Sequence, residues 1–231
     1  MRPAHGLVVP GKETHVIRQI IAPRRHLGGS RRKPILAALA LALGLLGAGA
    51  VGADPGGRAE QIVGERCHLC HGRDGQSASA VYPRLAGQNA EYVAKQLADF
   101  KSGKRKSETM KPQAESLSEE EMQALGAFFA TKKPAARPAK DADLVAVGRY
   151  LFAQGNRFSG VPACSTCHGP RAAGTPQLPR LAGQHPRYIE DQLAQFNKRE
   201  RTNDNAVMHT IASKLTELET HALAEYLATL E

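Results

Sequence analysis

The residues Cys-His-Leu-Cys-His-Gly at positions 67–72 decide how this chain folds, because the same pattern returns as Cys-Ser-Thr-Cys-His-Gly at positions 164–169. A second motif, Pro-Arg-Leu-Ala-Gly-Gln, follows the first copy at 83–88 and the second copy at 179–184. Matching positions lie 96 to 98 residues apart across the whole repeat. Self-similarity at a fixed spacing indicates two copies of one structural unit, which differ by single residues in their loops.

Each copy is predicted to be helical. Val93, Leu97 and Phe100 lie at i, i+4 and i+7, which is one face of a helix, and residues 189–196 repeat the pattern. A matching first helix is expected near Ala59–Arg66. Strand signals are weak throughout, so the predicted fold class is all-α.

Helix starts are marked by polar residues at capping spacing. Ser118 with Glu121, and Thr216 with Glu219, have the pattern of a capping box that opens the last helix of each copy. Asp143 or a neighbour is expected to cap the first helix of the second copy.

The two copies are joined by a segment with two prolines and three basic residues at 132–138, which is typical of an extended linker. The sequence therefore predicts tandem helical domains at 54–131 and 141–231, with a linker at 132–140. A core of this size is modest for one domain, so a buried cofactor would supply apolar bulk to each.

The basic charge of the chain is concentrated before the repeats. The formal net charge is +9, but residues 1–53 contain eight Lys or Arg and one acid, leaving 23 bases and 21 acids in residues 54–231. That balance gives no field for nucleic acid. The basic residues 31–33, the apolar run 35–51 and the small residues before Asp54 are typical of a cleaved export signal. We therefore expect residues 1–53 to be an extension with a signal peptide and the protein to be periplasmic; an uncleaved membrane anchor is the alternative.

All four cysteines, Cys67, Cys70, Cys164 and Cys167, lie in the two Cys-x-x-Cys-His motifs. This spacing is the attachment signal for c-type haem, because two thiols three residues apart reach the two vinyl groups of one porphyrin. Zinc binding would need more ligands, and a redox dithiol usually follows a strand, for which there is no signal. The predicted cofactors are two covalent haem c groups.

The axial iron ligands are predicted from the same repeat. His71 and His168 complete the attachment motifs, and Met110 and Met208 follow them by 39 and 40 residues within polar segments, where packing is a weak motive for methionine. Three histidines are alternatives to the methionines, although none has a counterpart in the first copy: His185, His209 and His221.

Prolines recur at a constant place after the attachment motifs. Pro83 and Pro179 follow the ligand histidines by 12 and 11 residues. A ligand histidine usually donates its second ring N–H to an acceptor, and a proline carbonyl could accept it here. A simple turn is the alternative role for each proline.

These motifs together, over about residues 58–231, resemble the cytochrome c4 family. The resemblance implies two domains similar to mitochondrial cytochrome c that face each other about an approximate two-fold axis. It also implies electron transfer from a quinol-oxidising cytochrome bc complex to a terminal oxidase. The cytochrome subunit of sulfide-oxidising flavoproteins shares the same motifs and is the alternative.

His/Met ligation leaves no open site on either iron, so the chain is predicted to be an electron carrier and not an enzyme; a diheme peroxidase is a weaker alternative. Redox proteins are the expected partners, and loose association with a membrane stays open. A basic stretch before Met110 is expected to be exposed and to meet an acidic partner. It comprises Lys101, Lys104, Arg105 and Lys106.

Overall fold

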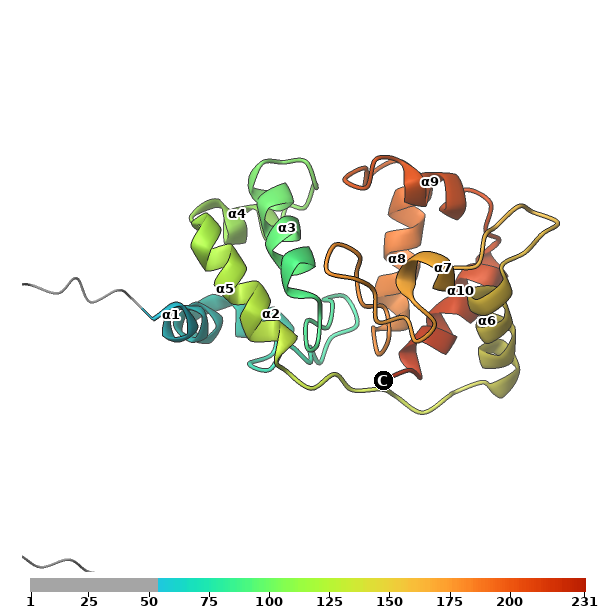
Figure 1. Ribbon diagram of the computed structural model, residues 1–231, viewed down its shortest axis with the longest axis horizontal. Helices are drawn as coiled ribbons and strands as arrows, with labels where there is room; N and C mark the ends of the chain where they lie inside the picture. Colours follow the sequence, from blue (N-terminus) through green and yellow to red (C-terminus); the bar gives the residue numbers. More distant parts are fainter. Residues whose placement is uncertain (1–53) are drawn as a thin grey trace, which may run out of the picture. The chain divides into compact units, whose positions relative to one another are not determined.

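The computed structural model describes residues 54–231, and the predicted extension, signal peptide and cleavage site lie outside these residues (Figure 1). Regular structure within 54–231 is helical, as predicted, and β structure there is limited to an antiparallel bridge between Asn156 and Val161. Of the helices in this part of the chain, none is long and apolar enough to cross a membrane.

The helices form two similar sets. Those before the linker are α1 Pro55–Ile62, the π-helical turn η1 Val63–Cys67, α2 His68–His71, α3 Ala90–Lys101, α4 Met110–Glu115 and α5 Glu119–Ala130. Those after it are α6 Ala142–Gln154, α7 Ser165–His168, α8 Pro186–Asn197, α9 Val207–Ala212 and α10 Glu217–Ala228. In the first set α5 packs on α1 and α3, and in the second α10 packs on α6 and α8.

Each set has its own apolar core. In the first, Ile62, Leu117 and Leu125 are almost completely buried, and in the second, Phe152 is. Burial of such a side chain contributes about 1.5–3 kcal/mol. Met122, whose matching position in the second copy is Thr220, lies in the first core.

The capping boxes predicted for α5 and α10 are both present. The Ser118 hydroxyl accepts from the Glu121 N–H, the Thr216 hydroxyl accepts from the Glu219 N–H, and each glutamate accepts from the backbone N–H of its cap. Asp141, rather than Asp143, caps α6.

The first helix begins earlier than the sequence indicated. Asp54 accepts hydrogen bonds from the N–H groups of Gly56 and Gly57, so α1 starts at Pro55. It then widens into η1, which ends at Cys67. Such π-helical turns are frequent at functional sites, and this one delivers the chain to the first attachment motif.

Two helix crossings depend on glycine. A Cβ atom on Gly148 of α6 would lie 2.0 Å from the Ala222 carbonyl oxygen of α10, and one on Gly126 of α5 would lie 2.3 Å from the Ala90 carbonyl oxygen. The two helices at each crossing can therefore approach this closely only because the residue at the contact is glycine, which has no Cβ atom.

The segment between α5 and α6 lies against the folded chain. The Arg137 N–H donates to the Ala228 carbonyl (2.9 Å), and its guanidinium pairs with the Glu225 carboxylate. The Gln76 side chain donates to the Lys133 carbonyl.

Candidate haem sites

One cavity of about 1250 Å³ is bordered by residues from both sets of helices. All ten site residues predicted from the sequence line it: Cys67, Cys70, His71, Pro83, Met110, Cys164, Cys167, His168, Pro179 and Met208. The structure therefore brings together residues that lie up to 141 positions apart in the chain.

The attachment motifs are short helices ended by glycine. The helices α2 and α7 both end at the histidine of the motif, and Gly72 and Gly169 follow with φ of 76°. This φ lies in the left-handed region that glycine adopts without strain. The chain can thus turn away directly after His71 and His168, which are 6% and 9% exposed.

Each motif histidine is oriented by a proline carbonyl. Nδ1 of His71 lies 2.9 Å from the Pro83 oxygen, and Nδ1 of His168 lies 3.3 Å from the Pro179 oxygen. Because the carbonyl can only accept, Nδ1 carries the proton and Nε2 is the ring nitrogen available to a metal. Burial lowers the pKa of both histidines, against a smaller opposing effect of the carbonyls, which favours the neutral imidazole that metal ligation requires.

The two methionines lie in the first turns of short helices, although the polar segments around them are also typical of loops. Met110 is the first residue of α4, where its N–H donates to the Ser107 hydroxyl (3.1 Å). Met208 is the second residue of α9, and its N–H donates to the Asp204 carboxylate. The polar residues that made these segments resemble loops are the ones that satisfy the first N–H groups of the helices.

The alternative histidines do not border the cavity. Nε2 of His185 bonds to the Ser77 carbonyl (2.9 Å), Nδ1 of His209 bonds to the Phe196 carbonyl (3.0 Å), and Nδ1 of His221 bonds to Glu190 (2.6 Å). These contacts explain the three histidines without a metal.

None of the four cysteines forms a disulfide. Burial raises the pKa of Cys67, and it raises the pKa of Cys164 to about 11. A zinc site needs thiolates, and the burial of these two cysteines disfavours them.

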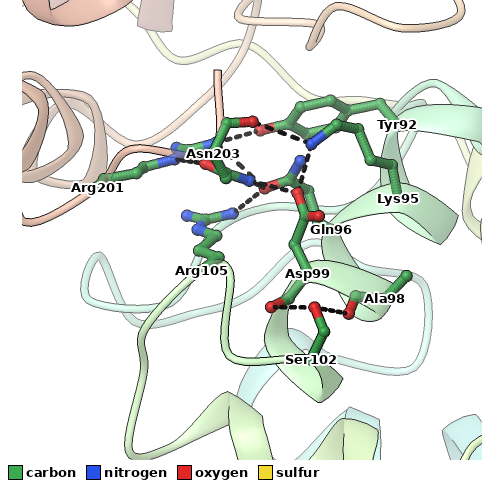
Figure 2. Close-up of polar contacts among 9 residues, drawn as sticks. All are labelled: Tyr92, Lys95, Gln96, Ala98, Asp99, Ser102, Arg105, Arg201 and Asn203. Atoms are coloured by element: carbon green, nitrogen blue, oxygen red, sulfur yellow. Dashed lines mark hydrogen bonds and ion pairs between the residues drawn. The ribbon is translucent and has the colours of Figure 1, made fainter. Parts of the chain in front are cut away.

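A buried polar network joins residues that border the cavity (Figure 2). The Arg105 guanidinium donates to Gln96 (2.7 Å), which lies in its own half of the chain. It also donates to Tyr188 Oη (3.0 Å) and Gln192 (2.7 Å) in the other half. Arg105 thus links the two sets of helices.

Arg201 repeats this arrangement in reverse. It donates to Gln192 in its own half (2.7 Å), and to Tyr92 Oη (2.9 Å) and Gln96 (3.2 Å) in the other. Arg105, Gln96 and Tyr92 lie 96 residues before Arg201, Gln192 and Tyr188, so the contacts between the halves are related by an approximate two-fold axis.

The repeated Pro-Arg-Leu-Ala-Gly-Gln motifs meet in the same way. The Gln184 amide bonds to the backbone N–H and C=O of Arg84 (2.8 and 3.0 Å), and the Gln88 amide bonds to those of Arg180 (2.7 and 2.9 Å). No role for these glutamines was predicted from the sequence. Their constant spacing of 96 residues, unlike the 97 and 98 at the cysteines and methionines, was the available signal.

Arg105 was predicted to be an exposed docking residue, and this is wrong, because it is 7% exposed and its charge is used inside the network. Burial acts to lower the pKa of Arg105, but Tyr188, Tyr92 and, least of all, Asp99 together act to raise it by more. The pKa of Tyr188 is lowered, because Arg105 and Arg201 outweigh the opposing effect of burial.

The cavity fits two haem groups by its chemistry. Each end offers two thiols, a histidine with Nε2 free for iron, and apolar walls that include Leu97 and Phe129 in the first half and Ile189 and Leu227 in the second. The buried guanidinium groups of Arg105 and Arg201 border the cavity and can compensate the charge of the acidic side chains of a porphyrin.

Two helical domains with one covalent attachment motif each define a c-type cytochrome with two haem c groups. Residues 145–231 match the family model described as Cytochrome c, and residues 55–129 match that described as Cytochrome C oxidase, cbb3-type, subunit III. The cytochrome c4 of Pseudomonas aeruginosa is 39% identical over 198 residues, which covers 84% of this chain and 96% of the relative. The chain belongs to the cytochrome c4 family.

Two further relatives show the range of similar proteins. The crystal structure of reduced recombinant cytochrome c4 from Pseudomonas stutzeri matches with a TM-score of 0.72 and 34% identity, covering 77% of this chain and 99% of that one. A protein of Thiomonas intermedia named thiosulfate dehydrogenase electron acceptor is 38% identical over 167 residues, covering 70% of this chain and 77% of the relative.

Proposed function

We propose that the chain is a periplasmic electron carrier that accepts electrons from a quinol-oxidising cytochrome bc complex and delivers them to a terminal oxidase. The observation that carries the electron-carrier role is that both attachment motifs and both methionines border one cavity. Membership of a family of diheme electron-transfer cytochromes supports it. The predicted export signal at residues 31–53 supports the periplasmic location.

The proposed roles of the site residues follow the repeat. The four cysteines hold the haems by thioether bonds, His71 and Met110 bind one iron, and His168 and Met208 bind the other. The carbonyls of Pro83 and Pro179 fix the rings of the histidines. Bound haem supplies reversible one-electron chemistry, and the protein fixes its ligands and excludes water.

Two filled axial positions explain why an electron carrier is favoured over a peroxidase. A peroxidase needs one iron with an open or displaceable position, whereas here a methionine borders each end of the cavity at matching places. Histidine and methionine together also raise the reduction potential relative to two histidines.

A second candidate function is to accept electrons from a thiosulfate dehydrogenase. The similarity to the Thiomonas intermedia protein of that name favours it over the sulfide-oxidising flavoprotein. The same two haem sites would serve either donor, so only the donor differs between the candidates.

The test is the visible spectrum of the purified protein in both oxidation states, with haem counted per chain. We expect two low-spin haems and the weak far-red band of methionine-bound ferric iron. Met110→Ala and Met208→Ala should each remove about half of that band and lower one of the two reduction potentials. One high-spin haem in the unmodified protein would contradict the carrier and favour the peroxidase. Reduction rates with a cytochrome bc complex and with a thiosulfate dehydrogenase then distinguish the donors.

A further inference from the structure

The large apolar side chains exposed in residues 54–231 fall into two groups. Four border the haem cavity, and their exposure belongs to the haem sites: Leu69, Val81, Leu178 and Val207. The other four lie away from the cavity, and all are in the second domain: Val147, Tyr150, Phe158 and Leu218, which are 44%, 65%, 88% and 63% exposed. We name this second group the α6 patch.

The α6 patch is presented by an ordered hairpin. After α6 the chain turns back at residues 156–161, where Asn156 and Val161 exchange two backbone hydrogen bonds of 2.8 and 3.0 Å. Figure 1 shows this loop projecting between α6 and α7. Phe158 lies near its tip, and the Arg157 guanidinium lies 4.8 Å from the centre of its ring.

The hairpin is also fixed to α10. The Asn156 side chain donates to Glu219 (2.8 Å), and the Lys214 ammonium donates to the Gly160 carbonyl (3.0 Å). Leu218 adjoins Glu219 and lies one turn before Ala222, where α10 meets α6 at Gly148. The hairpin, α6 and the start of α10 thus form one region of the surface.

The first domain has no equivalent of this region. There η1 leads directly into Cys67 without a hairpin, and the exposed residues of α1 and η1 include the polar Glu60, Gln61 and Glu65. Because both domains fold and bind haem with the same elements, the haem fold itself does not require the α6 patch.

The hairpin leads directly to the second haem site. Val161 closes it, and the next three residues, Pro162, Ala163 and Cys164, all border the cavity. A protein seated on the hairpin would therefore lie beside the attachment site of the second haem, where Cys167 is exposed.

The composition of the surface indicates a protein partner. Aromatic side chains and arginine are enriched at the centres of protein interfaces, and the patch combines Phe158 and Tyr150 with exposed Arg149 and Arg157. Binding to an anionic membrane usually needs a cluster of basic residues. The exposed cations of this region include Arg149, Arg157 and Lys214, and the exposed carboxylates of Asp143 and Glu217 offset two of these three charges.

We propose that the α6 patch docks a redox protein whose surface has an apolar pocket bordered by carboxylates, so that electrons exchange with that partner through the second haem. The pocket would receive Phe158, and the carboxylates would pair with Arg149 and Arg157. This inference rests on the proposed function, since it names the surface that an electron carrier uses.

The test uses the complete protein with both haems and the double variant Phe158→Ser with Tyr150→Ser. Second-order rates of electron exchange are measured with a purified thiosulfate dehydrogenase as donor and a terminal oxidase as acceptor. A small reductant, hexaammineruthenium(II), needs no docking surface and reports the intact haems. The matched control is Glu60→Ser, on the exposed face of the corresponding helix α1.

We expect the double variant to exchange electrons with at least one protein about tenfold more slowly than the parent. Its rate with the small reductant should equal that of the parent, and the Glu60→Ser control should match the parent with every reagent. Arg157→Glu should slow the same reaction and weaken its dependence on salt. Unchanged rates with both proteins overturn the inference. If the double variant loses binding to phosphatidylglycerol vesicles but keeps its rates of electron exchange with both proteins, the inference is overturned and the patch is a lipid-binding surface. If the small reductant reduces the unmodified protein rapidly but neither protein exchanges electrons with it, the inference is also overturned. If the small reductant does not reduce the unmodified protein reversibly, the proposed function itself is contradicted.

Discussion

Replacing Gly148 by alanine tests whether the crossing of α6 and α10 sets the packing around the second haem. In an unobstructed helix this substitution stabilises the fold by about 0.5–1 kcal/mol, because alanine restricts the unfolded chain. Here the added Cβ would lie 2.0 Å from the Ala222 oxygen, 2.6 Å from its carbon and 2.8 Å from Tyr226 Cβ. The nearest obstacles are backbone atoms, so the whole helix must move.

Overpacking of this kind costs about 1–3 kcal/mol, and a backbone obstacle this close belongs at the upper end. After subtracting the gain in helix propensity, we expect Gly148→Ala to lower the free energy of unfolding by about 2 kcal/mol. For a domain of about 90 residues, such as 141–231, that corresponds to a fall in Tm of roughly 8–16 °C. Phe152 of α6 and Leu223 of α10 border the second haem site, so the far-red band of that haem should weaken as well.

The assay is guanidinium unfolding followed by far-ultraviolet circular dichroism, with the far-red absorbance recorded on the same samples. Gly64→Ala is the matched control, since its nearest neighbour would be Arg73 Nη1 at 3.8 Å and it should leave stability unchanged or raise it by up to about 1 kcal/mol. A Gly148→Ala protein as stable as the Gly64→Ala protein would refute the reasoning.

Two further predictions concern the domain contact and the response to acid. Arg105→Ala should leave Tyr188 Oη without its arginine donor, and Arg201→Ala should do the same to Tyr92 Oη, each costing about 1–3 kcal/mol. Each variant should also split one calorimetric unfolding transition into two; a single unshifted transition in both variants would be contrary to the two-fold network. The pKa of Glu121 is lowered by the backbone N–H of Ser118 and by Arg58, so this carboxylate stabilises the fold above the unfolded pKa of 4.5 and ceases to do so as the pH falls through its lower folded value. Glu121→Gln should therefore be less stable than the parent at neutral pH, with the difference narrowing below pH 4.5 in unfolding titrations; a difference that stays constant with pH would count against this origin.

Local patterns predicted the helices well, because their causes are local. The apolar spacing of Val93 and Phe100 and the capping pair Ser118 and Glu121 act within a few residues, and the structure has them as expected. The start of the first helix was missed because two glycines after Pro55 lower helix propensity. The contact between Arg58 and Glu121, 63 positions apart in the chain, was not visible from local sequence.

The interface between the domains is where sequence reasoning failed. Arg105 lies among lysines and was interpreted as a surface charge, whereas its partners Tyr188 and Gln192 lie more than 80 residues away. The local sequence around a polar residue does not indicate whether residues from a distant part of the chain will bury its side chain. Only the repeat could have revealed this, since Arg201 stands at the same spacing of 96 residues as the glutamines and tyrosines it contacts.

Comparison of the two copies separates what the haem fold requires from what it does not. Both copies have the attachment motif, the proline carbonyl, the methionine and the arginine of the network, so substitution of any one should affect corresponding haems in similar ways. The hairpin at 156–161 and the carboxylate of Asp99, whose counterpart is Gln195, occur in one copy only. The first domain has the same fold without the hairpin, and the second has it without a carboxylate at the position of Asp99. The fold therefore requires neither feature. Features that distinguish one haem site from the other, and so give electrons a direction through the molecule, must therefore come from such unshared residues.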